Sequence, residues 1–175
     1  MDIRWDLTDG EVQSVLLRVS AATGGRMLEP MTETGRMLLT STQMRFRVQR
    51  GPDGHPWTPS QRVVKHGGQT LSLTARLRNS IHSVPTNTAV SVGTNVKYAA
   101  PNQFGFYGEQ QVRAHLRRVR VVFGRVLKKA VKAKVGPFER LGRLPRREFL
   151  GFSQDDRQEI IHIFNAYFDR VIAGF

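Results

Sequence analysis

The residue types that could do chemistry in this sequence are concentrated in one basic segment. Thirteen lysines and arginines lie between residues 113 and 147, against Glu139 as the one acid there, so this stretch holds twelve of the thirteen excess positive charges of the chain. Such asymmetry is typical of a surface that binds nucleic acid, an anionic surface or an acidic protein face. A merely solvated face is the alternative. The candidate contacts for nucleic acid or a protein partner are Arg113, Arg117, Arg118, Arg120, Arg125, Lys128, Lys129, Lys132 and Lys134.

The remaining polar residues form no catalytic or metal-binding pattern. The five histidines lie far apart and form no metal-ligand spacing with carboxylates, and cysteine is absent. Asp155 and Asp156 fall in the first turn of an expected helix, where acids offset the helix dipole. Gly67-Gly68 and the fragment at 93–95 lack the lysine and the context of a phosphate-binding loop. We therefore expect a protein that is not an enzyme and has no metal and no cofactor.

The length and composition predict a single domain over residues 1–175. No apolar run approaches the roughly 20 residues of a membrane-spanning helix, and the N-terminus lacks the layout of a signal peptide. We expect a cytosolic protein without a membrane partner, and the absence of cysteine is compatible with a reducing compartment.

The secondary structure is predicted from apolar periodicity, capping residues and turn residues. The expected elements are a strand at 1–6, a helix at 11–22, a helix at 30–49, a short helix at 59–66, antiparallel strands at 80–84 and 89–93, and a short helix or turn at 97–104. Tyr98 and Phe104 are candidates for the core.

The basic segment itself is expected to be a long β-hairpin arm. Apolar and basic residues alternate from Val112 to Phe123, with a change of parity that indicates a bulge near Arg118. Residues 126–135 fit both a strand and a helix, so the helix remains the alternative there. The preferred interpretation is an arm over about 111–136 that turns near Gly124.

The C-terminal segment predicts a helix to near residue 173. Ser153 and Asp156 have the spacing of a capping box. The apolar stripe, expected to pack on the sheet, is Ile160, Ile161, Phe164, Phe168, Val171 and Ile172. The predicted fold is α+β: a small antiparallel sheet packed with N-terminal and C-terminal helices, plus the long basic hairpin arm.

Trp57 lies in the stretch GPDGHPWTP at 51–59, where prolines and glycines exclude regular structure. A large ring in such a stretch indicates an anchor that pins the loop to the domain, burying roughly 150–250 Å². The alternative is a ring that simply caps one edge of the core.

Several fragments, in this order, resemble the virion morphogenesis family of tailed phages, known for tail-completion or neck proteins in Mu-like and P2-like viruses. They are Arg45-Phe46, residues 51–59, residues 73–81 (LTARLRNSI), residues 92–94 (VGT) with Tyr98-Ala99, residues 103–105 (QFG) and residues 144–151 (LPRREFLG). The resemblance covers about residues 45–156. Its structural motif positions are Pro56, Trp57, Leu77, Ser80, Gly93, Phe104, Phe149 and Leu150.

The sequence departs from the family pattern at three places. Ala75 stands where a turn glycine is usual, which implies a negative φ at this position. Asn102 stands where histidine is common, and residues 145–151 read Pro-Arg-Arg-Glu-Phe-Leu-Gly instead of Pro-Ala-Arg-Pro-Phe-Leu-Gly.

The resemblance implies a structural subunit of the head–tail connector (neck) or of the tail-terminal ring, needed for tail completion and head–tail joining. It implies a homo-oligomeric ring, a hexamer or alternatively a dodecamer, in the virion neck or head-proximal tail end, assembled in the host cytoplasm. The implied partners are connector, tail-terminator or tail-tube proteins and the packaged double-stranded DNA, which the basic arm would approach without reading bases. An acidic neighbouring ring competes for the same charges. The alternative function is a stand-alone, sequence-independent nucleic-acid-binding protein.

Overall fold

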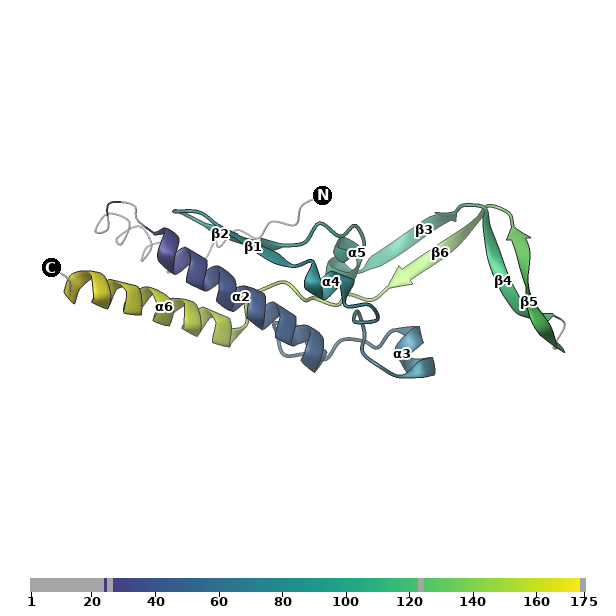
Figure 1. Ribbon diagram of the computed structural model, residues 1–175, viewed down its shortest axis with the longest axis horizontal. Coiled ribbons are helices and arrows are strands. Elements are labelled where there is room, and N and C mark those ends of the chain that lie inside the picture. Colours follow the sequence, from purple (N-terminus) through teal and green to yellow (C-terminus); the bar gives the residue numbers. More distant parts are fainter. Residues whose placement is uncertain (1–23, 25–26, 123–124, 174–175) are drawn as a thin grey trace.

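The computed structural model describes residue 24, residues 27–122 and residues 125–173. Within these residues the protein is α+β, as predicted. An elongated body of helices and one hairpin extends at one end into a long β-ribbon (Figure 1). The strand expected at 1–6 and the helix expected at 11–22 lie outside the described residues.

Most elements lie within a few residues of their predicted ranges. In chain order they are α2 (Leu28–Val48), α3 (Gln61–His66), α4 (Arg76–Asn79), β1 (His82–Pro85), β2 (Val90–Gly93), α5 (Ala99–Phe104), β3 (Phe106–Val112), β4 (His115–Val122), β5 (Arg125–Val135), β6 (Phe138–Leu144) and α6 (Gln154–Ala173). The three antiparallel pairs are β1–β2, β3–β6 and β4–β5.

Helix α2 is the central layer of the body, between the β1–β2 hairpin and α6 (Figure 1). Gly35 allows the hairpin to approach, because a Cβ there would lie only 3.1 Å from Cγ2 of Val90. On its other side α2 shares an apolar cluster with Ile160 and Phe164 of α6. We predicted that α6 packs on the sheet, but its main neighbour is α2, because α2 has buried residues facing both layers. The hairpin contacts this cluster through Val90 and Val92.

Three side chains that were predicted to be buried are exposed instead. Tyr98 and Phe104 are exposed, and the residues that α5 buries are Ala99, Asn102 and Gln103. In α6, Ile161 is also exposed and lies off the buried stripe.

Ala75 also differs from the prediction, because its φ is +53° where we expected a negative value. This left-handed turn leads into α4, where the carbonyl of Ala75 accepts a hydrogen bond from the amide of Asn79 at 2.9 Å. Position 75 therefore takes a conformation that favours glycine, although alanine stands there. The strain costs on the order of 1–2 kcal/mol for a residue with a Cβ.

The arm consists of two successive ribbons. The proximal ribbon, β3–β6, pairs Phe106 with Leu144 and Val112 with Phe138, and the distal ribbon, β4–β5, pairs His115 with Val135. The chain bends between them where residues 113–114 and 136–137 leave the strands (Figure 1). The arm thus runs from 106 to 144, beyond the expected 111–136.

The distal ribbon decides between the alternatives for residues 126–135, which form a strand and not a helix. Pairing with β4 explains this outcome, since backbone groups of a strand need a partner that periodicity alone cannot identify. The expected bulge near Arg118 lies slightly further along, as a register shift between Val119 and Val121. The predicted turn at Gly124 falls outside the described residues, between the ends of β4 and β5.

Candidate functional site

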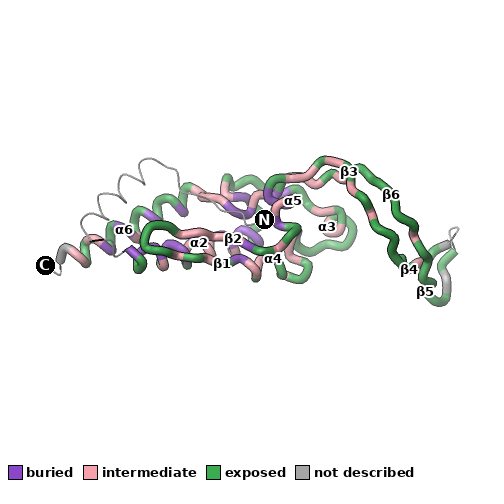
Figure 2. The backbone as a smooth tube through the Cα atoms, turned by 90° about the horizontal axis from the view of Figure 1, so that it is seen from above, coloured by how far each residue is buried: buried purple, intermediate pink, exposed green. Residues whose placement is uncertain are grey.

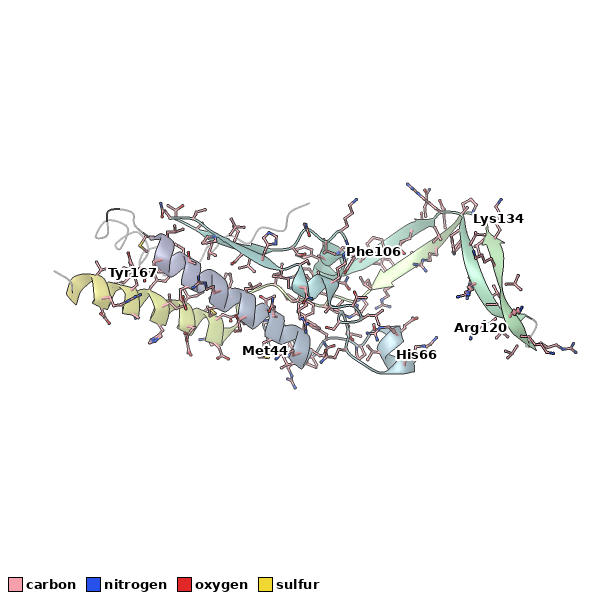
Figure 3. The ribbon with its side chains drawn as sticks, viewed as in Figure 1. Met44, His66, Phe106, Arg120, Lys134 and Tyr167 are labelled. Atoms are coloured by element: carbon pink, nitrogen blue, oxygen red, sulfur yellow. The ribbon has the colours of Figure 1, made fainter. Side chains whose placement is uncertain are left out.

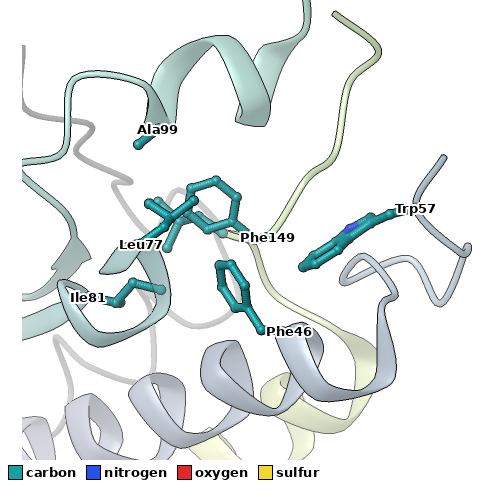
Figure 4. Packing of buried hydrophobic residues seen from close by; sticks show 7 residues of the cluster. Phe46, Trp57, Leu77, Ile81, Ala99 and Phe149 are labelled. Carbon is teal, nitrogen blue, oxygen red and sulfur yellow. The ribbon is translucent and has the colours of Figure 1, made fainter. Parts of the chain in front are cut away.

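The Trp57 ring anchors its loop as predicted. Only 6% of Trp57 is exposed, and its ring meets Phe46 edge-on with centroids 5.3 Å apart (Figure 4). The amide of Trp57 donates to the carbonyl of Gln49 at 2.8 Å, which closes the loop onto the end of α2. Its indole Nε1 donates to the carbonyl of Glu148 at 2.9 Å. The tryptophan therefore holds two segments together, its own loop and residues near 148.

The second of these segments has no helix or strand of its own. Residues 145–153, which we call the connecting segment, run from the end of β6 to the start of α6. Phe149 and Leu150 are 0% and 2% exposed. A buried segment without regular structure must find partners for its amides and carbonyls, since each unpaired group costs about 1–3 kcal/mol.

Gln103 supplies several of those partners. Its Oε1 accepts hydrogen bonds from the amides of Phe149 and Leu150, both at 3.0 Å, and its Nε2 donates to the carbonyl of Leu150 at 2.8 Å. The side chain is fully buried. One glutamine thus replaces the hydrogen bonds that a neighbouring strand would otherwise provide.

Arg45 and Asp156 complete the set from the opposite side. Arg45 NH1 donates to the carbonyl of Phe149 at 3.0 Å and to that of Gly151 at 2.8 Å, while NH2 binds Asp156 Oδ2. Asp156 also closes the predicted capping box with Ser153, whose Oγ accepts from the amide of Asp156 at 3.1 Å.

The surroundings of the buried Arg45–Asp156 pair favour the ionised form of the Asp156 carboxyl group. Burial lowers the pKa of Arg45, and Asp156 opposes that shift. Burial by itself would raise the pKa of Asp156, but hydrogen bonds from Ser41 and Ser153, with the charge of Arg45, bring the pKa below its ordinary value. Asp156 therefore links α6 to α2 as a carboxylate.

We call the side chains of Arg45, Phe46, Trp57, Gln103 and Asp156, together with the connecting segment, the hub. The hub also sets where the arm begins. β3 starts directly after Gly105, which has a φ of +78°. A side chain at this position would be strained and tightly packed, because its Cβ would lie 3.2 Å from both the Arg146 amide nitrogen and the Leu144 carbonyl oxygen. β6 ends at Leu144, where the connecting segment begins. Both strands of the arm thus leave the body at the hub.

The arm itself is largely exposed (Figure 2). All nine cations predicted as partner contacts lie in the distal ribbon or at the bend before it, and all are exposed. Arg120 lies toward the tip and Lys134 near the bend (Figure 3). Residues 113–135 contain no acid, and no ion pair among the described residues involves these cations. The proximal ribbon, in contrast, contains Glu109 and Glu139 beside its arginines.

The two sides of the distal ribbon differ in character, because directly opposed residues of an antiparallel pair share a face. The cationic face contains Leu116, Arg118, Lys132 and Lys134, with Arg118 opposite Lys132 and Leu116 opposite Lys134. The valine face contains His115, Arg117, Val119, Val131, Ala133 and Val135.

The motif positions expected from the resemblance lie mostly in or around the hub. Four of these side chains are buried: Trp57, Leu77, Phe149 and Leu150. The Ser80 hydroxyl lies 2.7 Å from the hydroxyl of Thr94, and Pro56 forms an isolated β-bridge with Arg50. Gly93 ends β2 opposite His82. Phe104 is 56% exposed and stands outside the core. Sequence reasoning predicted the capping box of Asp156 with Ser153 but missed the roles of Arg45 and Gln103 and the ion pair between Arg45 and Asp156. Two of these polar residues fall within the quoted fragments, which was the available signal.

The family model of the phage virion morphogenesis family matches residues 7–169. The chain belongs to this family. Its description places the protein among those that build phage particles, a virion-associated role in assembly. No curated protein and no solved structure matches the chain.

Two structural observations accompany this family membership. No helix among the described residues is long and apolar enough to cross a bilayer. The part of the chain that the structure describes also brings together no group of three or more His, Cys, Asp or Glu side chains that could hold a metal ion.

Proposed function

We propose that this virion morphogenesis protein is a structural subunit of the head–tail connector (neck) or of the tail-terminal ring, acting in tail completion and head–tail joining. It acts by assembly and not as an enzyme. It works as a homo-oligomeric ring, with a hexamer favoured over a dodecamer, between connector and tail-terminator or tail-tube proteins. The observation that carries the proposal is a long, exposed, cationic ribbon that leaves the hub of this chain, together with the membership of the chain in a family of phage virion morphogenesis proteins.

The exposure of the arm supports a role in assembly. A two-stranded ribbon is marginally stable in water unless something packs against it. Leu116, Val121, Val126 and Val131 of the distal ribbon are each more than half exposed, and β4 and β5 each have one unpaired edge. A partner in the particle would cover this surface.

The charge of the arm supports a place near the DNA path. Lysines and arginines that face a channel attract phosphates without reading bases, which suits DNA that must slide. The segment from 113 to 135 has Phe123 as its single aromatic residue, so no stacking platform for single strands is evident. Double-stranded DNA is therefore the favoured nucleic acid.

The same charge favours one alternative, a protein that binds nucleic acid by itself, independently of sequence. The two functions differ in oligomeric state, since a free binder should be a monomer or dimer. Light scattering of the purified protein measures this directly. A mass near six or twelve subunits supports the ring, whereas a monomer that binds duplex DNA supports the alternative.

The function of the arm can be tested by removing the distal ribbon alone. Val112 and Phe138 are directly opposed, so residues 113–137 can be replaced by Asn-Gly, which favours a two-residue hairpin turn. The hub and the proximal ribbon stay intact, so the variant should fold and form rings. In phage lacking the natural protein, we expect it to leave heads and tails unjoined or tails incomplete in electron micrographs. Normal, infectious particles would contradict the proposed role of the arm.

A further inference from the structure

The cations of the distal ribbon are not equivalent, because its two faces place them in different surroundings. On the cationic face Arg118 lies directly opposite Lys132, and Lys134 is a diagonal neighbour. On the valine face Arg117 lies opposite Ala133, with Val131 and Val135 as its diagonal neighbours. Arg117 and Arg118 are adjacent in β4, but Arg118 has cations as its cross-strand neighbours and Arg117 has small apolar residues.

We propose that the cationic face, through Arg118, Lys132 and Lys134, is the surface of the arm that contacts phosphate groups of duplex DNA, and that bound phosphate consolidates the ribbon. The proposal rests on the proposed function in placing DNA beside the arm, and it adds which face binds and what binding does to the arm.

The first argument is the repulsion between Arg118 and Lys132. Like charges directly opposite each other in an antiparallel pair destabilise the ribbon. No residue from 113 to 135 is acidic, so the distal ribbon itself provides no counter-charge. A phosphate between the two side chains would convert this repulsion into two charge-assisted contacts.

The second argument is the marginal stability of the ribbon. It has two strands and a register shift between Val119 and Val121, and it lies beyond the bend that separates it from the proximal ribbon. Such an element gains order when a ligand binds its folded form, because the ligand shifts the equilibrium toward that form. DNA binding and order of β4–β5 should therefore be coupled.

A short blunt duplex DNA of mixed sequence, titrated with the full-length protein over a series of salt concentrations, tests the face assignment. Arg118→Gln, Lys132→Gln and Lys134→Gln should each weaken binding about threefold to tenfold and reduce the slope of log K against log salt by about one. Arg117→Gln is the matched control, with the same charge loss on the other face of the same strand. Arg117→Gln should reduce the slope of log K against log salt by less than half of the reduction caused by Arg118→Gln.

Hydrogen exchange of the amides in 115–135 tests the coupling. In the free protein at low salt, Arg118→Gln should increase protection of the ribbon by a factor of about two to five, because it removes the like-charge pair. Arg117→Gln should leave protection unchanged. Duplex DNA should increase protection in the natural protein and add less in Arg118→Gln.

Equal losses of DNA affinity for Arg117→Gln and Arg118→Gln would overturn the face assignment. So would variants that bind DNA normally but lose binding to polyglutamate, since the face would then fit an acidic protein. Unchanged protection in Arg118→Gln overturns the coupling. None of these results bears on ring formation or particle assembly. The proposed function is tested separately, by light scattering and by removal of the distal ribbon.

Discussion

The hub and the distal ribbon both contain polar and charged side chains, but these side chains are buried and paired in the hub and exposed in the distal ribbon. In the hub, Arg45 and Gln103 are buried, and their donors and acceptors serve backbone groups of the connecting segment. In the distal ribbon, Arg118 and Lys132 are exposed and face one another with the same charge. The hub is complete within one chain, whereas the ribbon has surface and charge that a partner would satisfy.

The fragments on which the resemblance to the family rests lie mostly in the body of this chain and outside the arm. The fragments RF, GPDGHPWTP, QFG and LPRREFLG lie in and around the hub. The hub determines where both strands of the arm leave the body. A rigid hub would place the exposed ribbon in the same position relative to the body in every subunit.

The largest expected effect comes from removing the hub's anchor. Trp57→Ala should lower the free energy of unfolding by about 3–5 kcal/mol, because it deletes a buried indole. Chemical denaturation measures the change. Tyr107→Ala removes an aromatic ring that is 73% exposed in the arm and should cost less than about 0.5 kcal/mol. Similar losses in the two variants would remove the contrast between hub and arm.

The buried ion pair should give a pH-dependent effect. Asp156→Asn should destabilise the protein by about 3 kcal/mol at neutral pH, because it leaves Arg45 buried without its counter-charge. The pKa of Asp156 is lowered on folding, so its contribution is present above the unfolded pKa of about 3.9 and is lost as the pH falls through the folded pKa.

Melting curves across the acid range should therefore show a steeper loss of stability in the natural protein than in Asp156→Asn. Asp155→Asn is the control, since Asp155 lies in the same helical turn but is exposed. If Asp155→Asn and Asp156→Asn melt alike at every pH, the pair does not brace α6 against α2.

Gln103→Leu should cost about 2–4 kcal/mol, because it leaves two buried amides and one carbonyl of the connecting segment without partners. Gln111→Leu is the matched substitution in the proximal ribbon, where the side chain is exposed and bonds to Glu139. It should change the free energy of unfolding by less than about 0.5 kcal/mol. Urea denaturation of both variants distinguishes them, and a tolerated Gln103→Leu would mean that water serves these groups.

A stabilising change is expected at the strained turn. Ala75→Gly should raise the free energy of unfolding by a few tenths of a kcal/mol up to about 1 kcal/mol, since glycine adopts a positive φ without the steric cost. Ala166→Gly, at an exposed position in the interior of α6, should instead destabilise by roughly 0.5–1 kcal/mol. Thermal melting measures both, and a loss at position 75 would show that the turn is not strained.

The smallest effect on stability is expected from reversing charges in the arm. The substitutions are Arg117→Glu, Arg120→Glu, Lys128→Glu and Lys132→Glu together. Exposed charges contribute little to stability, typically about 0–1 kcal/mol per pair, so the variant should melt close to the natural protein. Its binding to duplex DNA should nevertheless be lost, as measured by titration at low salt. A variant that unfolds would mean that the arm's charges are part of the fold.

The sequence by itself determined the features that depend on neighbouring residues or on composition. The charge of residues 113–147 can be counted without a structure. The helices α2 and α6 follow from apolar periodicity, and Ser153 with Asp156 formed the capping box that their spacing indicates. Trp57 was predicted as an anchor because the prolines and glycines around it exclude regular structure, with a ring at the edge of the core as the alternative, and the structure shows the ring buried. Local rules suffice when both partners lie within a few residues.

The tertiary structure decided the features that join distant residues. Residues 126–135 satisfy helical and strand periods alike, and pairing with β4 selects the strand. Gln103 contacts Phe149 and Leu150 across 46 and 47 positions, and Arg45 contacts Asp156 across 111, so no spacing rule identifies these bonds. Ala75 takes a left-handed turn against the preference of its own side chain. At Ala75 the surrounding fold outweighs a local cost on the order of 1–2 kcal/mol, because burial and hydrogen bonding over many residues add to more than one residue's conformational cost.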